Sequence, residues 1–386
     1  MPDDRSSAPR PFPDWPAGFV AGEPDRLALL VLTALPGLTA RRLRALAEAT
    51  GGAAACLAAV RRGHPTVEPA DRELAATLRP GDMSARLAEV GARMAVPGDD
   101  DYPPGVLDLP DPPVALFVRG RSLVGGPPAV AIVGARNCSP LGADVARSFG
   151  RDLASAGTWV VSGAARGIDS AAHEGALAVG GATVAVLGSG IDVAYPKRSR
   201  SLLDRIIAMG AVVSEYPPGV PAQPFRFPAR NRIVTAMSEA VLVVEGAAGS
   251  GSFITADFAL DLGRPVFAVP GPVTSPLSEA PLALIRDGAG LVRNAGDLLL
   301  DLGRLDPVAT FGADPASAGA QVPAGLSELE RRTLEMLSSP TLPEMLAASL
   351  GCGMAEALAA IVGLEVRGLA RTVGGRVERR LAAFDR

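Results

Sequence analysis

Residues 159–172 read WVVSGAARGIDSAA, and this stretch decides the fold. The apolar run Trp159–Val161 is typical of a buried strand, and the small residues after it lead into a helix start. Ser162, Gly163 and Gly167 let the backbone approach a ligand closely, because they carry little or no side chain. Strand, small-residue turn and helix in this order are typical of a doubly wound α/β sheet.

The same stretch predicts an anion site. Asp169 or Ser170 can cap the new helix, whose first backbone N–H groups point toward an anion. Arg166 adds a fixed positive charge with a planar fork that suits phosphate. The turn therefore predicts a phosphate ligand without identifying the compound, and the alternative is a plain tight turn with an exposed arginine.

Strands and helices alternate through the middle of the chain. The expected strands are Ala129–Val133, Trp159–Val161, Thr183–Leu187, Ala211–Ser214, Ala240–Val244 and Val266–Val269. The expected helices are Leu141–Ala156, Ser170–Val179, Ser199–Met209, Arg232–Met237, Thr255–Leu262 and Ala280–Asp287. Short strands that are apolar throughout are typical of a parallel sheet covered on both faces. We predict a doubly wound Rossmann-like sheet, which binds ligands at the carboxyl ends of its strands.

The flanking regions predict two smaller units. Asp25 to Leu78 is helical in pattern, and Pro36-Gly37-Leu38 resembles the hairpin of SAM-like or helix-hairpin-helix bundles, where it can hold a DNA phosphate or be purely structural. Near the C-terminus, helices at Glu328–Leu337, Leu342–Leu350 and Met354–Arg367 precede a hairpin of Leu369–Val373 and Val377–Arg380, which is a winged-helix pattern. The expected division is a disordered tail at 1–24, a helical SAM-like domain at 25–90, a Rossmann-like domain at 91–305, a linker at 306–323 and a winged-helix domain at 324–386.

Composition narrows the class of protein. No apolar run approaches the roughly 20 residues of a membrane helix. Cys56, Cys138 and Cys352 are isolated, which predicts neither a disulfide framework nor a zinc site and indicates a cytoplasmic location. Because the net charge is −4, any nucleic-acid site has to be a local basic patch.

Three glycine-rich or basic segments are expected at the same edge of the sheet as the opening turn. Gly134 and Arg136 follow the strand at 129–133, but the segment is not GxGxxG, so a dinucleotide fingerprint is weak. Lys197, the only lysine, lies beside Arg198 and Arg200 after the strand at 183–187. The turn Gly249, Ser250, Gly251 and Ser252 forms a second anion cradle, and it lacks the Lys-Ser/Thr of a P-loop.

The segment Phe225–Ile233, FRFPARNRI, interleaves arginines with aromatic rings. Such a pattern suits single-stranded nucleic acid, because cations follow the backbone and rings stack on bases. We therefore expect Arg230, Asn231 and Arg232 to contact DNA from a turn. The alternative is that the phenylalanines belong to the core and the arginines form ion pairs.

Catalytic sets are missing from the sequence. The two histidines are His64 and His173, and His173 is expected to pack inside the sheet domain rather than to act as a base. Asp169, Asp192 and Glu245 are expected to cap helices or to pair with arginines. We expect no catalytic residues, no metal site and no cofactor.

The order of these segments resembles the DNA-processing protein A (DprA/Smf) family. The motifs that carry the resemblance are IVGAR at 132–136, VSGAARGIDSAAH at 161–173, AVLGSGIDVAYP at 185–196, SEYPPG at 214–219, FPARNRIV at 227–234, VVEGAAGSGSFITA at 243–256 and RPVFAVPG at 264–271. They are collinear over about Val96 to Leu299, which makes the resemblance far more specific than any single glycine loop.

The resemblance implies a non-catalytic binder of single-stranded DNA that acts in natural transformation. It implies that the protein protects incoming strands, helps to load the recombinase RecA and forms a homodimer through the Rossmann-like domain, with no membrane partner. The DNA site that it implies comprises Gly134, Arg136, Ser162, Gly163, Arg166, Gly167, Asp169, Lys197, Arg230, Asn231, Arg232, Gly249, Ser250, Gly251 and Ser252.

The chain also departs from the family pattern. Ala135, Ala164 and Phe253 replace residues that the family usually has, and these look like packing changes. Glu279-Ala280-Pro281 brings an acidic residue and a proline into a loop where the family usually has G-x-N, which casts doubt on a DNA or dimer contact there.

Two questions stay open from the sequence. A nucleotide phosphoribohydrolase-like enzyme shares the sheet and the glycine turns, although no glutamate follows the turn at 246–255 as its chemistry needs. The winged-helix unit is either a duplex-DNA reader or a protein-docking module. The basic face of a DNA reader would comprise Arg367, Arg371, Arg376, Arg379 and Arg380.

Overall fold

The computed structural model describes residues 15–16, 18–126, 128–304, 326–337 and 341–379. The chain forms two compact units, Met1–Ala295 and Gly296–Arg386. The predicted linker at 306–323 lies outside the described residues, as do residues 1–14 of the predicted tail and Arg380.

A nine-stranded sheet in the order β1-β2-β6-β5-β4-β3-β7-β8-β9 forms the centre of the first unit. The strands are β1 (Ala92–Ala95), β2 (Leu116–Gly120), β3 (Ala129–Val133), β4 (Trp159–Ser162), β5 (Thr183–Leu187), β6 (Ala211–Ser214), β7 (Ala240–Val243), β8 (Val266–Ala268) and β9 (Gly290–Leu291). The sheet is parallel from β6 to β9, and β2 and β1 extend it antiparallel. The six predicted strands and the large parallel sheet are confirmed, whereas the short strands β1, β2 and β9 were not predicted.

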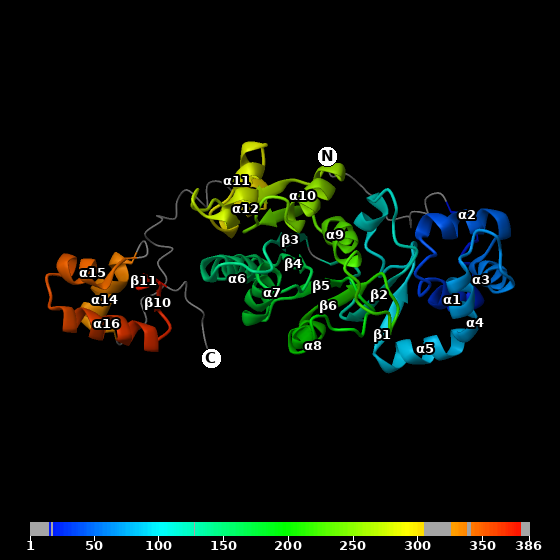
Figure 1. Ribbon diagram of the computed structural model, residues 1–386, viewed down its shortest axis with the longest axis horizontal. Helices are drawn as coiled ribbons and strands as arrows, with labels where there is room; N and C mark the ends of the chain where they lie inside the picture. Colours follow the sequence, from blue (N-terminus) through cyan, green and yellow to red (C-terminus); the bar gives the residue numbers. More distant parts are fainter. Residues whose placement is uncertain (1–14, 17, 127, 305–325, 338–340, 380–386) are drawn as a thin grey trace. The chain divides into compact units, whose positions relative to one another are not determined.

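Helices cover both faces of the sheet. They are α6 (Pro140–Ser155), α7 (Ile168–Ala178), α8 (Arg200–Met209), α9 (Arg226–Ala236), α10 (Gly251–Asp261) and α11 (Glu279–Arg286), and α12 (Ala295–Asp301) follows β9. Figure 1 shows α6, α7 and α8 on one face, with α9 and α10 on the other. Because β4 and β7 lie on opposite sides of β3, the chain changes direction there, and such a switch point opens a crevice at the strand ends.

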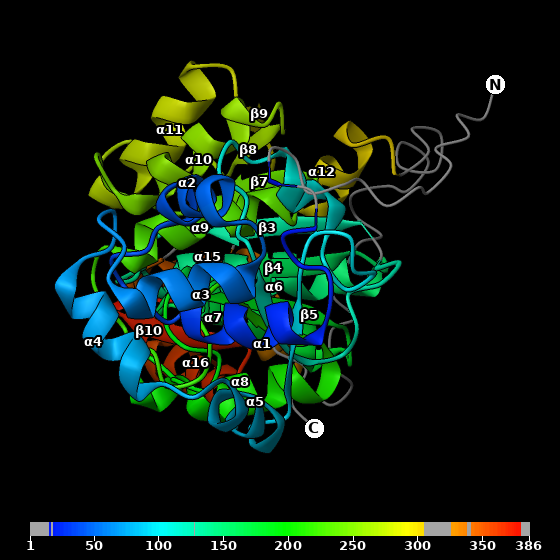
Figure 2. The same cartoon turned by 90° about the vertical axis from the view of Figure 1, so that its right-hand side faces the viewer.

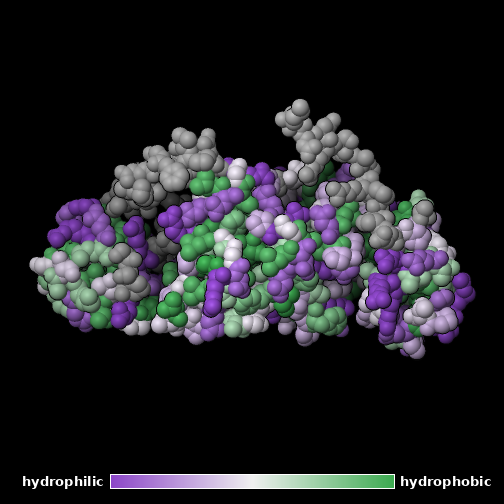
Figure 3. All heavy atoms as spheres, turned by 90° about the horizontal axis from the view of Figure 1, so that it is seen from above, coloured by the Kyte–Doolittle hydropathy of each residue, from purple (hydrophilic) through white to green (hydrophobic). Residues whose placement is uncertain are grey.

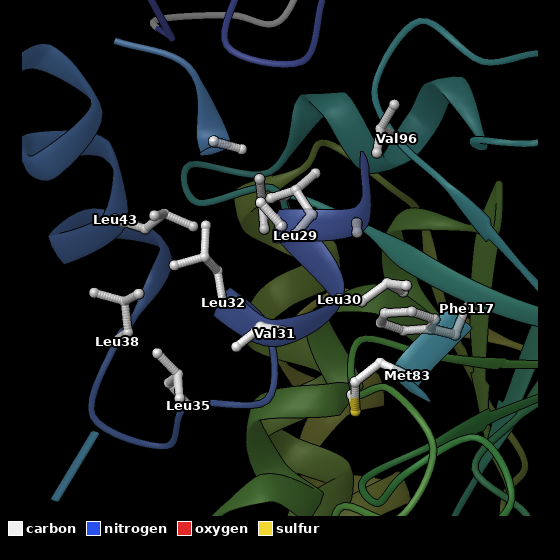
Figure 4. Close-up of a cluster of buried hydrophobic side chains, with 14 of the residues drawn as sticks. Leu29, Leu30, Val31, Leu32, Leu35, Leu38, Leu43, Met83, Val96 and Phe117 are labelled. Carbon is white, nitrogen blue, oxygen red and sulfur yellow. The ribbon is translucent and has the colours of Figure 1, made fainter. Parts of the chain in front are cut away.

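Five helices precede the sheet: α1 (Glu23–Leu32), α2 (Ala40–Thr50), α3 (Ala53–Arg62), α4 (Pro69–Thr77) and α5 (Pro80–Glu89). Their leucines form one buried cluster with Phe117 of β2, which the sequence could not place beside them (Figure 4). Figure 2 turns the molecule so that these helices face the viewer.

The prediction of disorder through residue 24 is wrong for its last part. Phe19 is buried, stacks on Trp15 and accepts a hydrogen bond from the Ala53 N–H at its carbonyl.

The second unit contains α14 (Glu328–Met336), α15 (Pro343–Leu350), α16 (Met354–Val366), β10 (Ala370–Val373) and β11 (Arg376–Arg379). The two strands pair antiparallel around Gly374 and Gly375, whose φ values of 57° and 77° suit a tight hairpin. A capping box at Ser327 and Glu330 starts α14. The predicted order of three helices and a hairpin is therefore present, with boundaries shifted by about one residue.

Hydrophobic residues are dispersed between polar ones on the face drawn in Figure 3. Within the described ranges, no single helix combines the length and hydropathy needed to cross a membrane. Two sharply bent pairs, α2 with α3 and α15 with α16, reach those values only when their helices are counted together.

Two glycines let α6 and α7 pack backbone to backbone. A Cβ on Gly175 would lie 2.0 Å from the carbonyl oxygen of Arg147, and one on Gly150 would lie 2.1 Å from that of Ala172. Neither neighbour is a flexible side chain, so a larger residue must push the helices apart. This contact holds α7, and with it the turn that precedes α7.

We predict that Gly175→Ala lowers the free energy of unfolding by about 1–3 kcal/mol, because the added methyl overpacks this contact. The matched control is Gly81→Ala in α5, where a Cβ would meet nothing within 4 Å. That change should be neutral or stabilising by up to about 1 kcal/mol, because alanine is the better helix former. Urea denaturation of both variants checks this, and equal effects would contradict it.

His173 on α7 is fully buried, as predicted, and its Nδ1 lies 2.7 Å from the Thr183 hydroxyl of β5. Burial lowers the pKa of this imidazole from 6.5 to about 3, and nearby Arg230 acts in the same direction. The folded protein therefore holds His173 neutral at a pH where the unfolded chain already protonates it. This residue makes the fold less stable as the pH falls from about 6.5 toward 3.

We predict that His173→Asn destabilises the protein at pH 7.5 and that the difference from the parent shrinks at pH 5. Asparagine keeps a polar atom near Thr183 but has no proton to gain, so only the parent loses this share of stability. The slope for one group is at most about 1.4 kcal/mol per pH unit, so the gap should narrow by about 1–2 kcal/mol. Urea titrations at the two pH values measure it, and a constant gap would contradict the assignment.

Candidate functional site

A carboxylate of α7 is hydrogen-bonded to the turn between β4 and α7. The Asp169 carboxylate accepts hydrogen bonds from the N–H groups of Gly163 and Ala165, at 3.1 and 3.3 Å. The predicted helix cap is thus present in altered form, because Asp169 lies inside α7 and reaches back over the turn. Burial raises the pKa of Asp169, and Arg230 together with the two N–H groups opposes that rise. The N–H groups of Gly163 and Ala165 are therefore engaged by Asp169.

The small residues of this turn also make close contacts inside the protein. A Cβ on Gly163 would lie 2.2 Å from the Arg230 guanidinium, and one on Gly167 would lie 2.2 Å from the Ala135 carbonyl oxygen. Gly134 likewise faces Ile168 and the Glu245 backbone. Ser162 is fully buried and donates to the Ile132 carbonyl at 2.6 Å. Ligand contact through these backbone positions was predicted, and the geometry gives each of them a structural contact.

Arg230 lies beneath the turn and not on the surface. The side chain is buried, and Nη1 donates to the Val186 carbonyl of β5. Burial lowers the pKa of Arg230 to about 10, so the group still carries its charge at neutral pH. Its Nε has no hydrogen-bond partner among the described residues. The prediction that Arg230, Asn231 and Arg232 belong to a turn is wrong, because α9 begins at Arg226 and buries Arg226, Arg230 and Arg232.

An exposed stack of a cation and two rings lies beside this turn. The Arg136 guanidinium lies 5.2 Å from the Phe227 ring centroid, and the Tyr195 ring lies 5.2 Å from Phe227 on a tilted plane. Arg136 is exposed, and Tyr195 is 56% exposed. Arg166 and Arg198, also exposed, line the same cavity. Three cations and two aromatic faces thus meet at the carboxyl ends of β3, β4 and β5.

A second cavity adjoins the first at the switch point of the sheet. Both cavities are lined by Arg136, Gly163, Ala165 and Arg230. The second continues between α9 and the start of α10, where Asn231, Ser250, Gly251, Ser252 and Thr255 line it. Its walls also include Val133, Val234 and Ile254, so this part is less polar. The segments predicted to meet at one sheet edge are therefore brought together here.

A carboxylate of the chain and a hydrogen bond between two serines occupy polar groups at the Gly249–Ser252 turn. The Ala248 N–H before it donates to the Glu279 carboxylate at 3.1 Å. Ser250 and Ser252 bond each other through their hydroxyls at 2.6 Å. The acidic departure noted in the sequence thus places a negative charge against the second predicted cradle.

Arg232 lies on the other side of α9. Its Nη2 donates to both carboxylate oxygens of Glu215, at 2.8 and 2.9 Å, and Nε lies 3.7 Å from Asp111. Glu215 and Asp111 more than offset desolvation and raise the pKa of Arg232. Arg226 stacks on Tyr216 at 4.4 Å on the same side. The prediction that Arg232 joins the other cations is not met by the structure, since it lines neither cavity described above.

Lys197 is exposed in the one-turn helix Lys197–Ser199. It lines neither of the two cavities, whereas its neighbours Tyr195, Pro196 and Arg198 line the first one. From the sequence, Arg198 was noted beside the lysine and the rings among the arginines at 225–233, but the predicted DNA-contacting residues did not include Tyr195, Arg198 and Phe227. The pairing of a ring with cations in both loops is the signal that would have added them.

The carboxylates of Glu245 and Asp192, which were expected to cap helices or to pair with arginines, hold backbone segments. Glu245 accepts from the N–H and hydroxyl of Ser139 at the start of α6, at 2.8 and 2.6 Å. Asp192 accepts from the Gly219 N–H at 2.7 Å and pairs with Arg86 at 3.0 Å. Among the described residues, no three His, Cys, Asp or Glu side chains are grouped to hold a metal ion.

The two other nucleic-acid candidates make some internal contacts. In the hairpin, the Gly37 N–H donates to the Asp71 carboxylate at 3.1 Å. In the second unit, Arg367 pairs with Glu330 and Arg371 with Glu378, each at 2.6 Å.

A sequence profile of the DNA recombination-mediator protein A family matches residues 93–303. The chain is 39% identical over 316 residues to the putative DNA processing protein DprA of Mycobacterium tuberculosis, covering 77% of this chain and 79% of that protein. The chain belongs to this DprA family.

Other DprA relatives match over shorter lengths. Protein Smf of Escherichia coli is 44% identical over 209 residues, covering 54% of this chain and only 56% of that protein. The crystal structure of DprA from Streptococcus pneumoniae matches with a TM-score of 0.60 at 33% identity, over 72% of this chain and 98% of that one. DprA from Helicobacter pylori, described for its single-stranded DNA binding mode, matches with a TM-score of 0.51 at 28% identity, over 55% and 96%. The resemblance found in the sequence is thereby confirmed.

We predict that Arg232→Met in this DprA lowers the free energy of unfolding by about 3 kcal/mol, because it leaves Glu215 without its partner in a largely buried pair. Arg166→Ala should stay within about 0.5 kcal/mol of the parent, since Arg166 is exposed. Thermal and urea denaturation separate the two roles. Equal destabilisation by both changes would contradict the division of the arginines into structural and surface groups.

Proposed function

We propose that this protein binds single-stranded DNA at the carboxyl ends of β3, β4 and β5 and carries out no chemistry on it. The observation that carries the proposal is the exposed stack of Arg136, Phe227 and Tyr195, with Arg166 and Arg198 lining the same cavity. Cations that follow a backbone and rings that stack on bases are what a single strand requires, whatever its sequence.

Each part of the site has a separate task in this proposal. Arg136, Arg166 and Arg198 neutralise phosphates, and Phe227 and Tyr195 offer faces to unpaired bases. Buried Arg230 adds a fixed positive charge below the strand, and Asp169 keeps the turn in shape. Duplex DNA has its bases stacked internally, so the rings give a preference for the single strand.

The proposal of a binder instead of an enzyme draws on the same geometry. Asp169, Asp192 and Glu245 each accept backbone N–H groups, which ties them to structural tasks. The alternative, a phosphoribohydrolase-like enzyme, would use a free carboxylate beside a nucleotide. Incubation with nucleoside monophosphates distinguishes the two, because base release at turnover rates would favour the enzyme.

The physiological role that we propose follows the family. As a recombination mediator, the protein would protect incoming strands during natural transformation, help to load RecA and act as a cytoplasmic homodimer through the sheet-containing unit. The helices at 25–90 would form a SAM-like domain, and residues 324–386 a winged-helix domain after a linker. Strand exchange by RecA on oligothymidine already coated with single-strand-binding protein tests the loading, and a rate unchanged by this protein would contradict it.

We predict that Arg166→Ala weakens binding of a labelled oligothymidine about tenfold at moderate salt, which equals about 1.4 kcal/mol. Loss of one phosphate contact should also lower the slope of log affinity against log salt by about 0.7. Phe227→Leu should weaken binding by a similar factor while leaving that slope unchanged, because stacking does not release counterions. Fluorescence anisotropy at several salt concentrations measures both quantities.

The matched control is Arg62→Ala, which removes an exposed arginine at the end of α3, outside both cavities. It changes the net charge by the same amount as Arg166→Ala. Equal loss of affinity in the two variants would mean that the overall charge, and not this site, governs binding. Affinity unchanged in Arg166→Ala and Phe227→Leu would refute the site.

A further inference from the structure

The helix α16 has two apolar faces, and only one of them is used by the core of its unit. Ala357, Ala360, Ile361 and Leu364 are buried against α14, α15 and the hairpin. On the opposite face Leu358, Val362 and Val366 are 44%, 54% and 82% exposed. A single exposed apolar residue needs no explanation, but a row of them along one helix is unusual for a surface that stays in water.

The exposed row is continuous. At 100° per residue, Ala355, Ala359, Val362 and Val366 lie within about 60° of one another on the helix surface, and Leu358 borders them. Each of the four is exposed, and none is charged. We call these five residues the outer face of α16. The charged residues of the helix, Glu356, Glu365 and Arg367, lie at its two borders.

The chemistry of the outer face excludes a phosphate backbone as its natural partner. Binding to DNA requires cations at the contact, and the outer face has none. Its alanines allow another helix to approach closely, and its valines and leucine supply the area to be buried. A second apolar helix is the partner that this surface fits.

We propose that the outer face of α16 binds the same face of a second copy of this chain, with the two helices antiparallel. The face is complementary to itself in this arrangement. A dyad near residues 360 and 361 sets Ala355 opposite Val366 of the second copy and Ala359 opposite Val362. Small residues then oppose larger ones along the whole contact, which is how packed helices fill space.

Charge selects the antiparallel orientation. Glu356 and Arg367 lie on the same border of the outer face, three turns apart. In an antiparallel pair, the same borders of the two copies meet in reverse order, so each Glu356 faces the other copy's Arg367. In a parallel pair, opposite borders of the two copies meet, so Glu356 and Arg367 would not face each other and this attraction would be lost. Arg367 can serve both contacts, because its pair with Glu330 uses only Nη1.

A single pair of helices buries less than the roughly 800 Å² per partner of a standard interface, so this contact is weak by itself. It forms readily only between chains that are held near one another or present at high concentration. The test therefore traps the contact chemically and does not rely on a stable dimer in dilute solution.

The experiment uses the full chain with Cys138 and Cys352 replaced by serine and a short thiol cross-linker. Ala355→Cys chains are mixed with Val366→Cys chains, and each is also treated alone. Antiparallel pairing brings the thiol introduced at position 355 to the thiol introduced at position 366 of the other chain, whereas like positions are about 16 Å apart by eleven residues of helix rise. The mixture should give covalent dimers at least fivefold faster than either chain alone, and adding Val362→Lys to both should abolish the gain.

Glu335→Cys on the exposed side of α14 is the control for random collision. If the mixture forms dimers no faster than this control, the proposal is refuted. The same result is expected if α16 docks on another part of its own chain or on another protein. Faster cross-linking of each chain alone than of the mixture would show parallel pairing and refute the orientation. Circular dichroism of each variant establishes that α16 is intact. None of these outcomes depends on whether the cavities of the first unit bind DNA.

Discussion

The bond between the Asp169 carboxylate and the N–H groups of Gly163 and Ala165 sets the shape of the candidate site. The turn that it closes includes Ala164 with φ of 51°, a left-handed conformation that costs alanine roughly 1 kcal/mol and persists only where surrounding contacts enforce it. Arg230 packs directly against Gly163, where no side chain larger than hydrogen fits. The Asp169 carboxylate thus holds the turn at residues 163–167, and the turn leaves room for Arg230. Arg166 belongs to the same turn and is exposed.

This arrangement explains how a buried arginine and an open anion site coexist. Asp169 compensates part of the Arg230 charge through space while the cavity between them stays accessible to solvent. In the proposed complex, a phosphate that enters the cavity meets Arg230, whose position is already fixed by burial. Less rotamer entropy is then lost on binding, because Arg230 is immobile before the ligand arrives. The exposed cations Arg136, Arg166 and Arg198 provide the remainder of the attraction.

The sequence predicted the sheet well and the site only in part. Parallel strands such as Ala129–Val133 are apolar because both faces are covered, so they are visible in a single chain. The strands β1, β2 and β9, at or next to the edges of the sheet, are not continuous apolar runs and have no such signature. Arg136 and Arg166 were placed correctly at the sheet edge. Arg232 was misplaced because the start of its helix was predicted six residues late. Within a helix, Arg230 and Arg232 are two residues apart and therefore point to opposite sides.

The carboxylates show the limit of motif reading most clearly. A glycine turn before a helix predicts a phosphate ligand. Beside each of the two turns, a carboxylate of the chain accepts a backbone N–H, that of Asp169 in one case and that of Glu279 in the other. Spacing alone distinguishes neither case from a ligand site, because Glu279 is 31 residues away from Ala248 in sequence. Selectivity for a strand must then come from exposed side chains, which is why the rings of Tyr195 and Phe227 matter more to the proposed function than the glycines that first indicated phosphate.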